Sequence, residues 1–389
     1  MKIVVLGGAG KMGCIAVQTL AGDERVDEVV IADFNLENAK TVADYLGSPK
    51  VKIAHVDVND HSGLVSTLQG ADTCLNATVY YTNLQIMEAC IEAGVNYTDM
   101  GGLFHTTLKQ LKLSDRFAEK GISAVLGMGS APGVPNIQSR YAADRLDMIE
   151  YVRIYDGIKP PPPDNVSFTY AVPTILDEMT LEPMAFENGE FVAKQPLTGF
   201  EDYWFSPPLG LLPMHYSLHS EVATIPITFK DKGIQECFFK INYWGMAKET
   251  VEKVNVLAQF GFAGKEPVDV SGAKITPREF MVAMMGNYVP PITDFLAPPK
   301  NQPPNWVKEI VTEVKGTKDG KEAIYRLGTL TLKGALPTGA APAITAIWLA
   351  EKRVPPGVNP PEVALEPEPF FKELEAIGIV TQVTVTQQI

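Results

Sequence analysis

The chain has 389 residues, of which 46% are hydrophobic and 20% are charged, and its formal net charge is −13 at pH 7. A chain of this length has room for two or three domains, each with a core of its own. No basic stripe breaks the acidic balance, which excludes nucleic acid and anionic membranes as expected partners.

The cysteines and the apolar runs predict a cytoplasmic protein. None of the four cysteines forms a Cys-x-x-Cys pair, and Cys14, Cys74 and Cys90 fall in predicted helices or strands, where a thiol is usually a small buried hydrophobe. The sequence opens on a strand pattern rather than a signal peptide, and no apolar run reaches the roughly 18 residues of a membrane-spanning helix. The histidines and cysteines form no metal-binding motif, so we expect no bound metal.

The first predicted elements form a dinucleotide-binding loop. An apolar strand at residues 3–6 runs into Gly8-x-Gly10-x-x-Gly13, and a helical pattern follows at residues 14–20. Gly8 permits the tight turn, Gly10 lets the backbone approach a pyrophosphate, and Gly13 allows close packing of helix and strand. The N-terminus of the helix offers free N–H groups and a positive dipole end to the phosphates. The loop residues expected to bind the cofactor are Gly8, Gly10, Lys11, Met12 and Gly13.

The second predicted strand indicates which cofactor binds. It covers residues 29–32 and ends at Asp33, twenty residues after Gly13. A carboxylate at this position accepts hydrogen bonds from the ribose hydroxyls of NAD and repels the 2′-phosphate of NADP. Phe34 and the two residues after it include no Arg or Lys that could receive that phosphate. We therefore expect NAD as the cofactor, with Asp33 and Phe34 among the residues that bind it.

Four further strands are predicted at residues 51–56, 73–76, 96–99 and 122–126. Helical patterns separate them, which is typical of a parallel sheet with crossover helices. Each strand ends in polar or glycine residues, and open α/β sheets bind ligands at these carboxyl ends. The residues expected to bind the cofactor at this edge are Asp57, Val58, Asn76, Ala77 and Thr78.

The pattern changes after the sixth strand. A turn rich in glycine and proline at residues 127–136 leads out of the nucleotide-binding region, and strands dominate from residue 151 to about 334. Residues 318–321, Lys-Asp-Gly-Lys, lie between two strand-like runs and predict a hairpin turn. An apolar helix at residues 340–352 needs a partner for its apolar face, which we expect to be the nucleotide-binding domain.

Several motifs together resemble the saccharopine dehydrogenase family. Besides the glycine fingerprint they are Asn76-Ala77-Thr78, Gly94-Val-Asn-Tyr-Thr-Asp99-Met-Gly-Gly102, Ala131-Pro-Gly-Val-Pro-Asn136 and Thr338-Gly-Ala-Ala-Pro-Ala-Ile-Thr-Ala-Ile347. The resemblance covers essentially the whole chain and implies an α/β fold in three parts. These are a Rossmann NAD-binding domain at residues 1–132, a second α/β domain with a largely antiparallel sheet at 133–334, and a C-terminal segment at 335–389 that returns to the Rossmann domain.

The resemblance also implies an activity and an assembly. The activity is hydride transfer between a nicotinamide cofactor and a C–N bond of an amino acid or polyamine derivative, and the middle domain would bind the substrate and form a homodimer. Within the family the chain most resembles lysine 6-dehydrogenases, which favours oxidative deamination of an amino acid. Its run His215-Tyr-Ser-Leu-His219-Ser-Glu221-Val-Ala-Thr-Ile-Pro226 departs from theirs. Two alternatives therefore stay open: a reductase of the saccharopine or carboxynorspermidine type that forms a secondary amine, and a non-catalytic NAD-binding regulator.

Four residues are candidates for the chemistry on the substrate. Asp99 ends the fifth strand, and the matching Asp of the family lies by the substrate, although this residue type also caps turns. Tyr80 follows the fourth strand beside the expected nicotinamide position, where it would bind substrate or pack. His215 and Glu221 belong, with His219, to the one close group of titratable residues in the middle domain, and a histidine suits proton transfer near neutral pH. We expect the substrate between the two domains, with Asp99 and Tyr80 on one wall and His215 or Glu221 on the other.

Overall fold

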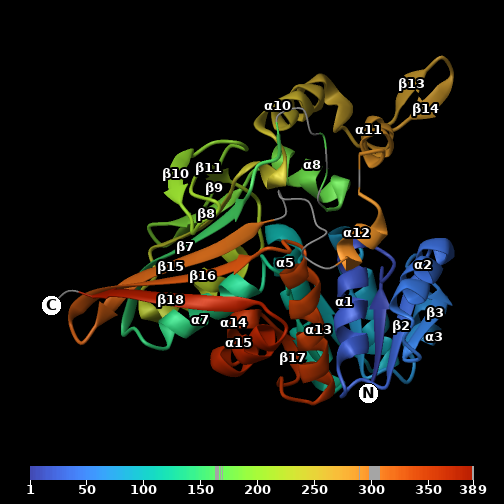
Figure 1. Cartoon of the computed structure of the whole chain (residues 1–389), viewed down its shortest axis with the longest axis horizontal. Coiled ribbons are helices and arrows are strands. Elements are labelled where there is room, and N and C mark those ends of the chain that lie inside the picture. Colours follow the sequence, from blue (N-terminus) through green and yellow to red (C-terminus); the bar gives the residue numbers. More distant parts are fainter. Residues whose placement is uncertain (163–165, 167, 169, 289, 298–306, 388–389) are drawn as a thin grey trace.

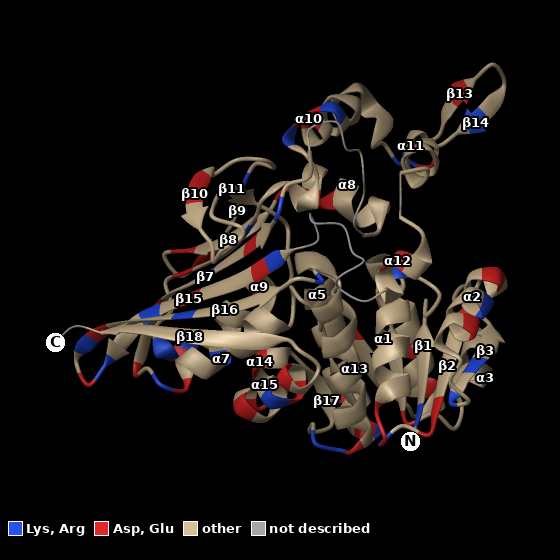
Figure 2. Ribbon diagram, viewed as in Figure 1, with Lys and Arg blue, Asp and Glu red and all other residues tan. Residues whose placement is uncertain are grey.

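The computed structural model describes residues 1–162, 166, 168, 170–288, 290–297 and 307–387. Over these residues the chain forms two large β-sheets with helices packed on them, and a helical arm projects beyond the sheets (Figure 1). Acidic and basic residues are interspersed along the helices and strands of both parts (Figure 2).

The first sheet is parallel and is built mainly by the N-terminal part of the chain. Among the described residues it has seven strands in the order β17-β6-β5-β4-β1-β2-β3. The chain order reverses between β1 and β4, so the carboxyl ends of these two strands form the crevice where such sheets bind ligands. The strands are β1 (Lys2–Leu6), β2 (Glu28–Asp33), β3 (Val51–His55), β4 (Thr73–Asn76), β5 (Asn96–Asp99), β6 (Ser123–Val125) and β17 (Gly357–Asn359).

Helices bury apolar side chains on both faces of this sheet. On one face α1 packs Ile15 and Val17 into a core with Ile31 of β2. On the other face a second core surrounds Tyr97 and Phe117. These cores fix the loops at the carboxyl ends of the strands. The helices of this part are α1 (Lys11–Gly22), α2 (Leu36–Leu46), α3 (His61–Leu68), η1 (Tyr80–Thr82), α4 (Asn83–Ala93), α5 (Leu103–Leu111) and α6 (Ser114–Glu119).

The second sheet is mixed and mostly antiparallel. In the part of the chain that the structure describes, its main path is β10-β11-β12-β7-β15-β16-β18, with β8 and β9 attached to β12. Strands β12 and β7 pair in parallel. The predicted hairpin is confirmed, because β15 and β16 pair around Asp319 and Gly320, which both have positive φ angles. The strands are β7 (Met148–Ile158), β8 (Met184–Glu187), β9 (Glu190–Ala193), β10 (Glu201–Trp204), β11 (Leu211–Tyr216), β12 (Glu236–Ile241), β15 (Lys308–Lys318), β16 (Lys321–Thr331) and β18 (Val380–Gln387).

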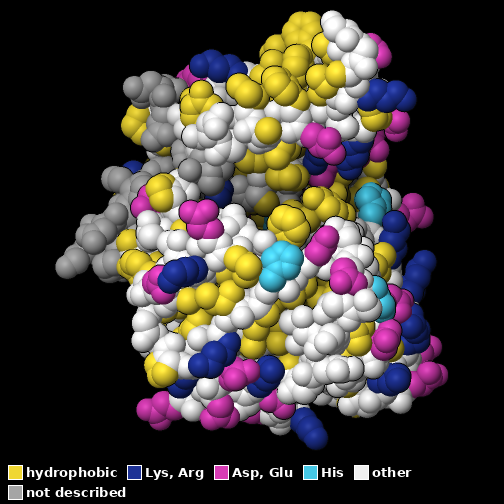
Figure 3. Space-filling view, turned by 90° about the vertical axis from the view of Figure 1, so that its right-hand side faces the viewer, with side chains coloured by type: hydrophobic (Ala, Val, Ile, Leu, Met, Phe, Trp, Pro, Cys, Tyr) yellow, Lys and Arg dark blue, Asp and Glu magenta, His cyan; other side chains and the backbone are white. Residues whose placement is uncertain are grey.

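Helices also pack on this second sheet, and an arm lies between β12 and β15 in the chain. The helices are α7 (Val134–Ala143), α8 (Val172–Thr180) and α9 (Glu221–Thr228). The arm consists of α10 (Lys248–Leu257), β13 (Val268–Val270), β14 (Ala273–Ile275) and α11 (Pro277–Gly286). Hydrophobic side chains gather on it, and the molecule is hollowed beneath it (Figure 3). After the arm, α12 (Ile292–Leu296) returns to the first sheet and buries Phe295 and Leu296 against α1.

The C-terminal segment divides between the two sheets. Helix α13 (Leu336–Ala350) buries Ala343 and Ile347 in the core that contains α1, and β17 extends the parallel sheet beside β6. Helices α14 (Pro361–Ala364) and α15 (Pro367–Ala376) follow. Strand β18 departs from the expectation that residues 335–389 return to the Rossmann domain as a whole. It pairs along β16 of the second sheet, because β16 offers an open edge to a segment with a strand pattern.

The predicted fold class is confirmed: the protein is α/β, with a parallel Rossmann-like sheet and a second α/β part whose sheet is largely antiparallel. Among the helices that the structure describes, none is both long enough and apolar enough to cross a membrane.

Candidate active site

The glycine loop after β1 has the form of a phosphate cradle. Gly7 takes the left-handed backbone conformation of the turn, with φ at 71°, so it is this residue rather than Gly8 that needs a positive φ. A Cβ on Gly8 would lie 3.0 Å from the carbonyl oxygen of Val5, and a Cβ on Gly13 would lie 2.2 Å from that of Gly7. Gly10 caps the N-terminus of α1, whose first N–H groups point out of the helix. The loop therefore fits a pyrophosphate.

A pocket beside the loop fits the adenosine half of a dinucleotide. Its volume is about 410 Å³. Asp33 tethers the loop, since its carboxylate accepts hydrogen bonds from the backbone N–H groups of Ala9 at 3.0 Å and Asn35 at 2.9 Å. The Phe34 ring is 70% exposed at the pocket and lies 5.5 Å from the His55 ring. The residues that line this pocket are Gly7, Ala32, Asp33, Phe34, Val56, Asp57, Val58, Asn59 and Thr78.

Thr78 connects this pocket to a larger cavity of about 450 Å³ that lies between the two sheets. Of the expected cofactor ligands, Gly10, Lys11, Met12 and Ala77 line the cavity. Asn76 lines neither space. It is 1% exposed and lies beneath the site, where its side-chain oxygen accepts hydrogen bonds from the backbone and the hydroxyl of Thr78.

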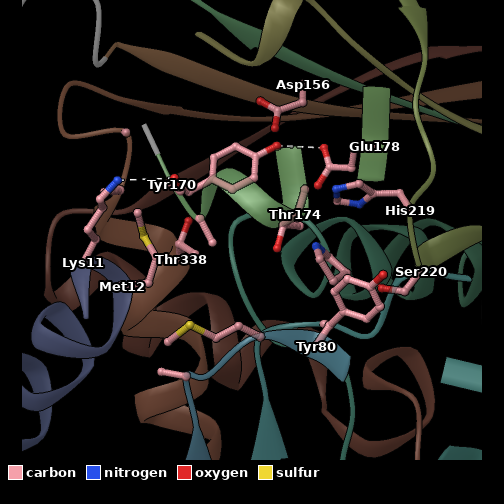
Figure 4. Close-up of a pocket in the computed structure, with 18 of the residues that line it drawn as sticks. Lys11, Met12, Tyr80, Asp156, Tyr170, Thr174, Glu178, His219, Ser220 and Thr338 are labelled. Atoms are coloured by element: carbon pink, nitrogen blue, oxygen red, sulfur yellow. Dashed lines mark hydrogen bonds between the residues drawn. The ribbon is translucent and has the colours of Figure 1, made fainter. Parts of the chain in front are cut away.

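The opposite wall of the cavity carries a His–Glu pair. His219 follows β11, and its Nδ1 lies 2.6 Å from Oε2 of Glu221, which is fully buried at the start of α9. The His219 ring stacks on Phe239 at 3.7 Å and lines the cavity with its other edge (Figure 4). Burial alone would lower the pKa of His219, but the charge and hydrogen bond of Glu221 outweigh it and raise that pKa. This arrangement suits a general acid–base group.

Next to His219, α8 places a carboxylate in the cavity. Oε2 of Glu178 accepts a hydrogen bond from the Tyr170 hydroxyl at 2.7 Å (Figure 4). It also accepts one from Nε1 of Trp244 at 2.6 Å. Glu178 is 3% exposed, and burial raises its pKa although the charge of His219 opposes the rise. The nearby charge of Asp156 raises it further. The end of the cavity at Glu178 is therefore acidic and largely shielded from water.

A second carboxylate enters from the second sheet. Asp156 of β7 is 3% exposed, and its Oδ2 lies 2.9 Å from Nζ of Lys308 at the start of β15. Its Oδ1 is buried and meets no hydrogen-bond donor among the residues that the structure describes. Both residues line the cavity. A buried carboxylate oxygen without a donor is unfavourable unless a ligand supplies one.

Lys11 reaches into the same space from the glycine loop. Its Nζ donates to the backbone carbonyls of Phe168 at 3.2 Å and Tyr170 at 3.3 Å. Burial lowers its pKa to about 8. Its place at the phosphate cradle suits the neutralisation of a pyrophosphate or of a carboxylate.

Asp99 does not line the cavity, in contrast to the expectation from the sequence. It is 1% exposed, and its carboxylate lies under the loops that form the cavity floor. Burial raises its pKa, while hydrogen bonds to it act in the opposite direction. The donors are the N–H groups of Gly127 at 2.7 Å and Gly101 at 2.9 Å and the side chains of Gln110 at 2.6 Å, Tyr97 at 2.9 Å and Asn83 at 3.2 Å. Asp99 therefore holds the loops at Gly101 and Gly127 in place.

The Asp99→Asn variant is expected to lose stability. The new NH₂ group would face hydrogen-bond donors, and each buried donor left without an acceptor costs about 1–3 kcal/mol. Chemical denaturation measures this loss, and Asp72→Asn is the matched control, since Asp72 is exposed at the opposite end of β4. An Asp99→Asn protein of native stability but without turnover would assign Asp99 to the chemistry instead.

The other predicted catalytic residues are placed differently from one another. Tyr80 lines the cavity as expected, and its hydroxyl donates to Asp177 at 2.9 Å. His215 does not reach the cavity: it is fully buried against Trp244, and burial lowers its pKa to about 4. Glu221 lies behind His219 rather than at the cavity surface. The histidine of this group that faces the cavity is thus His219, because β11 ends after His215 and the chain turns toward the first sheet before α9 begins.

The fold and the site were compared with known proteins. Residues 3–125 match the family model described as the saccharopine dehydrogenase NADP binding domain. The chain is 26% identical to the carboxyaminopropylagmatine dehydrogenase of Synechocystis sp. and 24% identical to the carboxynorspermidine synthase of Vibrio cholerae, with 97% of this chain and 96% of the relative covered in each case.

Two solved structures share the fold over nearly the whole chain. An apo saccharopine dehydrogenase (L-Glu forming) from Saccharomyces cerevisiae has a TM-score of 0.71 at 17% identity and covers 99% of both chains. The homospermidine synthase of Legionella pneumophila, in complex with NAD, has a TM-score of 0.65 at 13% identity and covers 98% of this chain and 91% of its own.

The glycine loop, the two-sheet fold and the matched nucleotide-binding domain define an NAD(P)-dependent oxidoreductase. Residues 3–125 match the nucleotide-binding domain of the saccharopine dehydrogenase family, and the whole chain shares its fold, so the resemblance of its motifs is confirmed.

Proposed function

We propose that the protein uses NAD(P)H to join a primary amine to a carbonyl compound, forming a secondary amine that carries a carboxylate. The observation that carries this proposal is the acidic end of the cavity, where Asp156 and Glu178 face the space beside His219. A cavity with two buried carboxylates favours a cationic amine as substrate.

The names of the relatives also support the formation of a secondary amine. Two are named for carboxynorspermidine and carboxyaminopropylagmatine, and a structural neighbour is named for homospermidine. Carbon chains joined through a nitrogen are common to these compounds. They favour the secondary-amine reductase over lysine 6-dehydrogenase, the leading expectation from the sequence.

The residues of the chain supply the proton transfers. Neutral His219 takes a proton from the entering ammonium group, which frees the nitrogen lone pair to attack the carbonyl carbon. In the adduct a proton passes from the nitrogen to the alkoxide oxygen, and the proton held by His219 then goes to the resulting hydroxyl, which leaves as water and creates a protonated C=N bond. Glu221 stabilises the imidazolium between the two steps, as a carboxylate behind a catalytic histidine does. The chemistry that a bound nicotinamide supplies here is a hydride for the carbon of that bond.

A two-substrate assay tests the proposal. The absorbance of NADH or NADPH is followed with an amine alone, with a carboxylated aldehyde alone and with both together. The expected result is that the reduced cofactor is consumed only when both are present. Reduction of NAD by L-lysine alone, with release of ammonia at a comparable kcat/KM, would contradict the proposal and favour deamination.

We propose further that NAD(H) is preferred to NADP(H), because Asp33 lies where a 2′-phosphate would approach. The expected preference is at least tenfold, about 1.4 kcal/mol, and Asp33→Asn should lose most of it. Fluorescence titration with both cofactors measures the ratio. Asp44→Asn, at an exposed position on α2, should keep it. Equal affinities for the two cofactors in the unaltered protein would overturn the preference.

The pH dependence of kcat/KM should report His219. At pH values below the pKa of the amine, the reaction needs His219 neutral at the start, so activity falls on the acid side as His219 becomes protonated. Glu221 raises the pKa of His219, so Glu221→Gln lowers that pKa, and the acid limb should move to lower pH. A limb that stays in place would show that another group controls it.

A further inference from the structure

The two carboxylates at the acidic end of the cavity each have one oxygen already occupied. Oδ2 of Asp156 is paired with Lys308, and Oε2 of Glu178 is held by Tyr170 and Trp244. The remaining oxygens are Oδ1 of Asp156, which is buried and has no hydrogen-bond donor among the described residues, and Oε1 of Glu178, which is not the oxygen that Tyr170 and Trp244 contact. Figure 4 shows both carboxylates on the same side of the cavity, with the Tyr170 ring between them and the glycine loop.

The charges at this end do not balance. With both carboxylates ionised, Asp156 and Glu178 contribute two negative charges, and Lys308 compensates one of them. Glu221 lies behind His219 and does not line the cavity, and Lys11 lies at the phosphate cradle, so neither belongs to this end. One negative charge is therefore left, in a space closed to water at Asp156, and a single positive charge on a ligand would neutralise it.

The geometry of the free oxygens distinguishes between two cationic groups. A guanidinium is planar and pairs best with both oxygens of one carboxylate. Neither carboxylate here offers both. An ammonium group has three N–H donors that point in different directions and can reach single oxygens on two carboxylates.

We propose that Asp156 and Glu178 form a subsite for a terminal ammonium group, so that the amine substrate is a diamine whose second nitrogen binds here while the first reacts beside His219. This inference rests on the proposed function and adds the class of amine to it.

The test compares amines of equal length with the same aldehyde and the unaltered enzyme. The set is a linear diamine, an alkylamine without the second nitrogen, and agmatine, which ends in a guanidinium. The diamine should exceed the alkylamine in kcat/KM by about 10²-fold or more, since a buried polar site rejects a ligand that leaves it unpaired. It should also exceed agmatine. Equal values for diamine and alkylamine, or a preference for agmatine, would overturn the subsite.

Variants of the two carboxylates test whether the preference for the diamine over the alkylamine arises at this subsite. Asp156→Asn and Glu178→Gln should lower kcat/KM for the diamine by a larger factor than kcat/KM for the alkylamine. Asp202→Asn and Glu190→Gln, at exposed positions on β10 and β9, are the matched controls. Equal losses for both amines would contradict a subsite for the second nitrogen.

Two further measurements test the subsite independently of the proposed function. Lys308→Met frees the second oxygen of Asp156 and should raise the ratio of agmatine to diamine turnover, and an unchanged ratio would contradict the role of the single oxygens. Calorimetry of diamine binding to the protein with NAD needs no turnover. If no amine reacts, the proposed function fails. Even then, diamine binding that Asp156→Asn weakens at least tenfold would support the subsite. Diamine binding that Asp156→Asn leaves unchanged would overturn the subsite.

Discussion

Replacing His219 by asparagine is expected to lower kcat/KM for secondary-amine formation by about 10²–10⁴-fold, the usual contribution of a general acid–base group. His219 is the histidine that lines the cavity with a buried carboxylate behind it, 2.6 Å from Nδ1. Affinity for the dinucleotide should change little, because the cofactor cradle is built by other residues. Steady-state kinetics and cofactor titration measure the two effects separately.

The matched control is His61→Asn. His61 also lies 2.9 Å from a carboxylate, that of Glu92, but both side chains are exposed and far from the cavity wall. This variant should keep its activity. If His219→Asn kept it as well, the proton transfers would have to be assigned to another group.

The second large effect is expected for Gly13→Ala. Its Cβ would lie 2.2 Å from the carbonyl oxygen of Gly7, so the glycine loop must move away from α1. We expect at least a tenfold loss of affinity for NAD together with a loss of stability of about 1–3 kcal/mol from overpacking. Cofactor titration and thermal unfolding measure these changes.

Gly22→Ala, in the same helix, is the control. A Cβ at Gly22 meets no atom within 4 Å, so its cofactor affinity should stay unchanged and its stability should be equal or slightly higher. Unaltered NAD affinity in Gly13→Ala would mean that the cofactor does not rest on this loop.

The first part of the fold is readable from the sequence because its signals are local. Buried strands alternate with helices, and each strand ends in the polar or glycine residues that mark a ligand-binding edge. The strands β4 and β5 coincide with the predicted ranges 73–76 and 96–99. The pairing of β18 with the second sheet could not be predicted in this way. Which sheet a terminal strand joins depends on which sheet edge is open in the folded protein.

The site can be predicted only in part from the sequence, because some of its residues meet only through the pairing of distant strands. The glycine loop, Asp33 and Tyr80 are signalled by their position after a strand. Asp156 and Lys308 are 152 residues apart and meet because β7 and β15 pair, which no local pattern encodes. Strand β7 also contains Glu150 and Arg153, so its sequence does not mark Asp156 as the buried carboxylate.

Within the group at residues 215–221, the structure places His219 at the cavity and buries His215 away from it. Spacing shows that His215, His219 and Glu221 are close in the chain, but not which ring faces the cavity. His215 is the last residue but one of a strand and points into a core with Trp244, whereas His219 lies in the connection that precedes α9.

The most direct test of the account is the mass of the product made with reduced cofactor that carries deuterium at the transferable position. The enzyme is incubated with this cofactor, a diamine and a carboxylated aldehyde, and the product is analysed by mass spectrometry. The expected product is a secondary amine whose mass is that of the two substrates less one water, plus one hydrogen and one deuterium, with the deuterium on the carbon bound to nitrogen. A deuterated alcohol formed from the aldehyde, with the diamine unchanged, would contradict it.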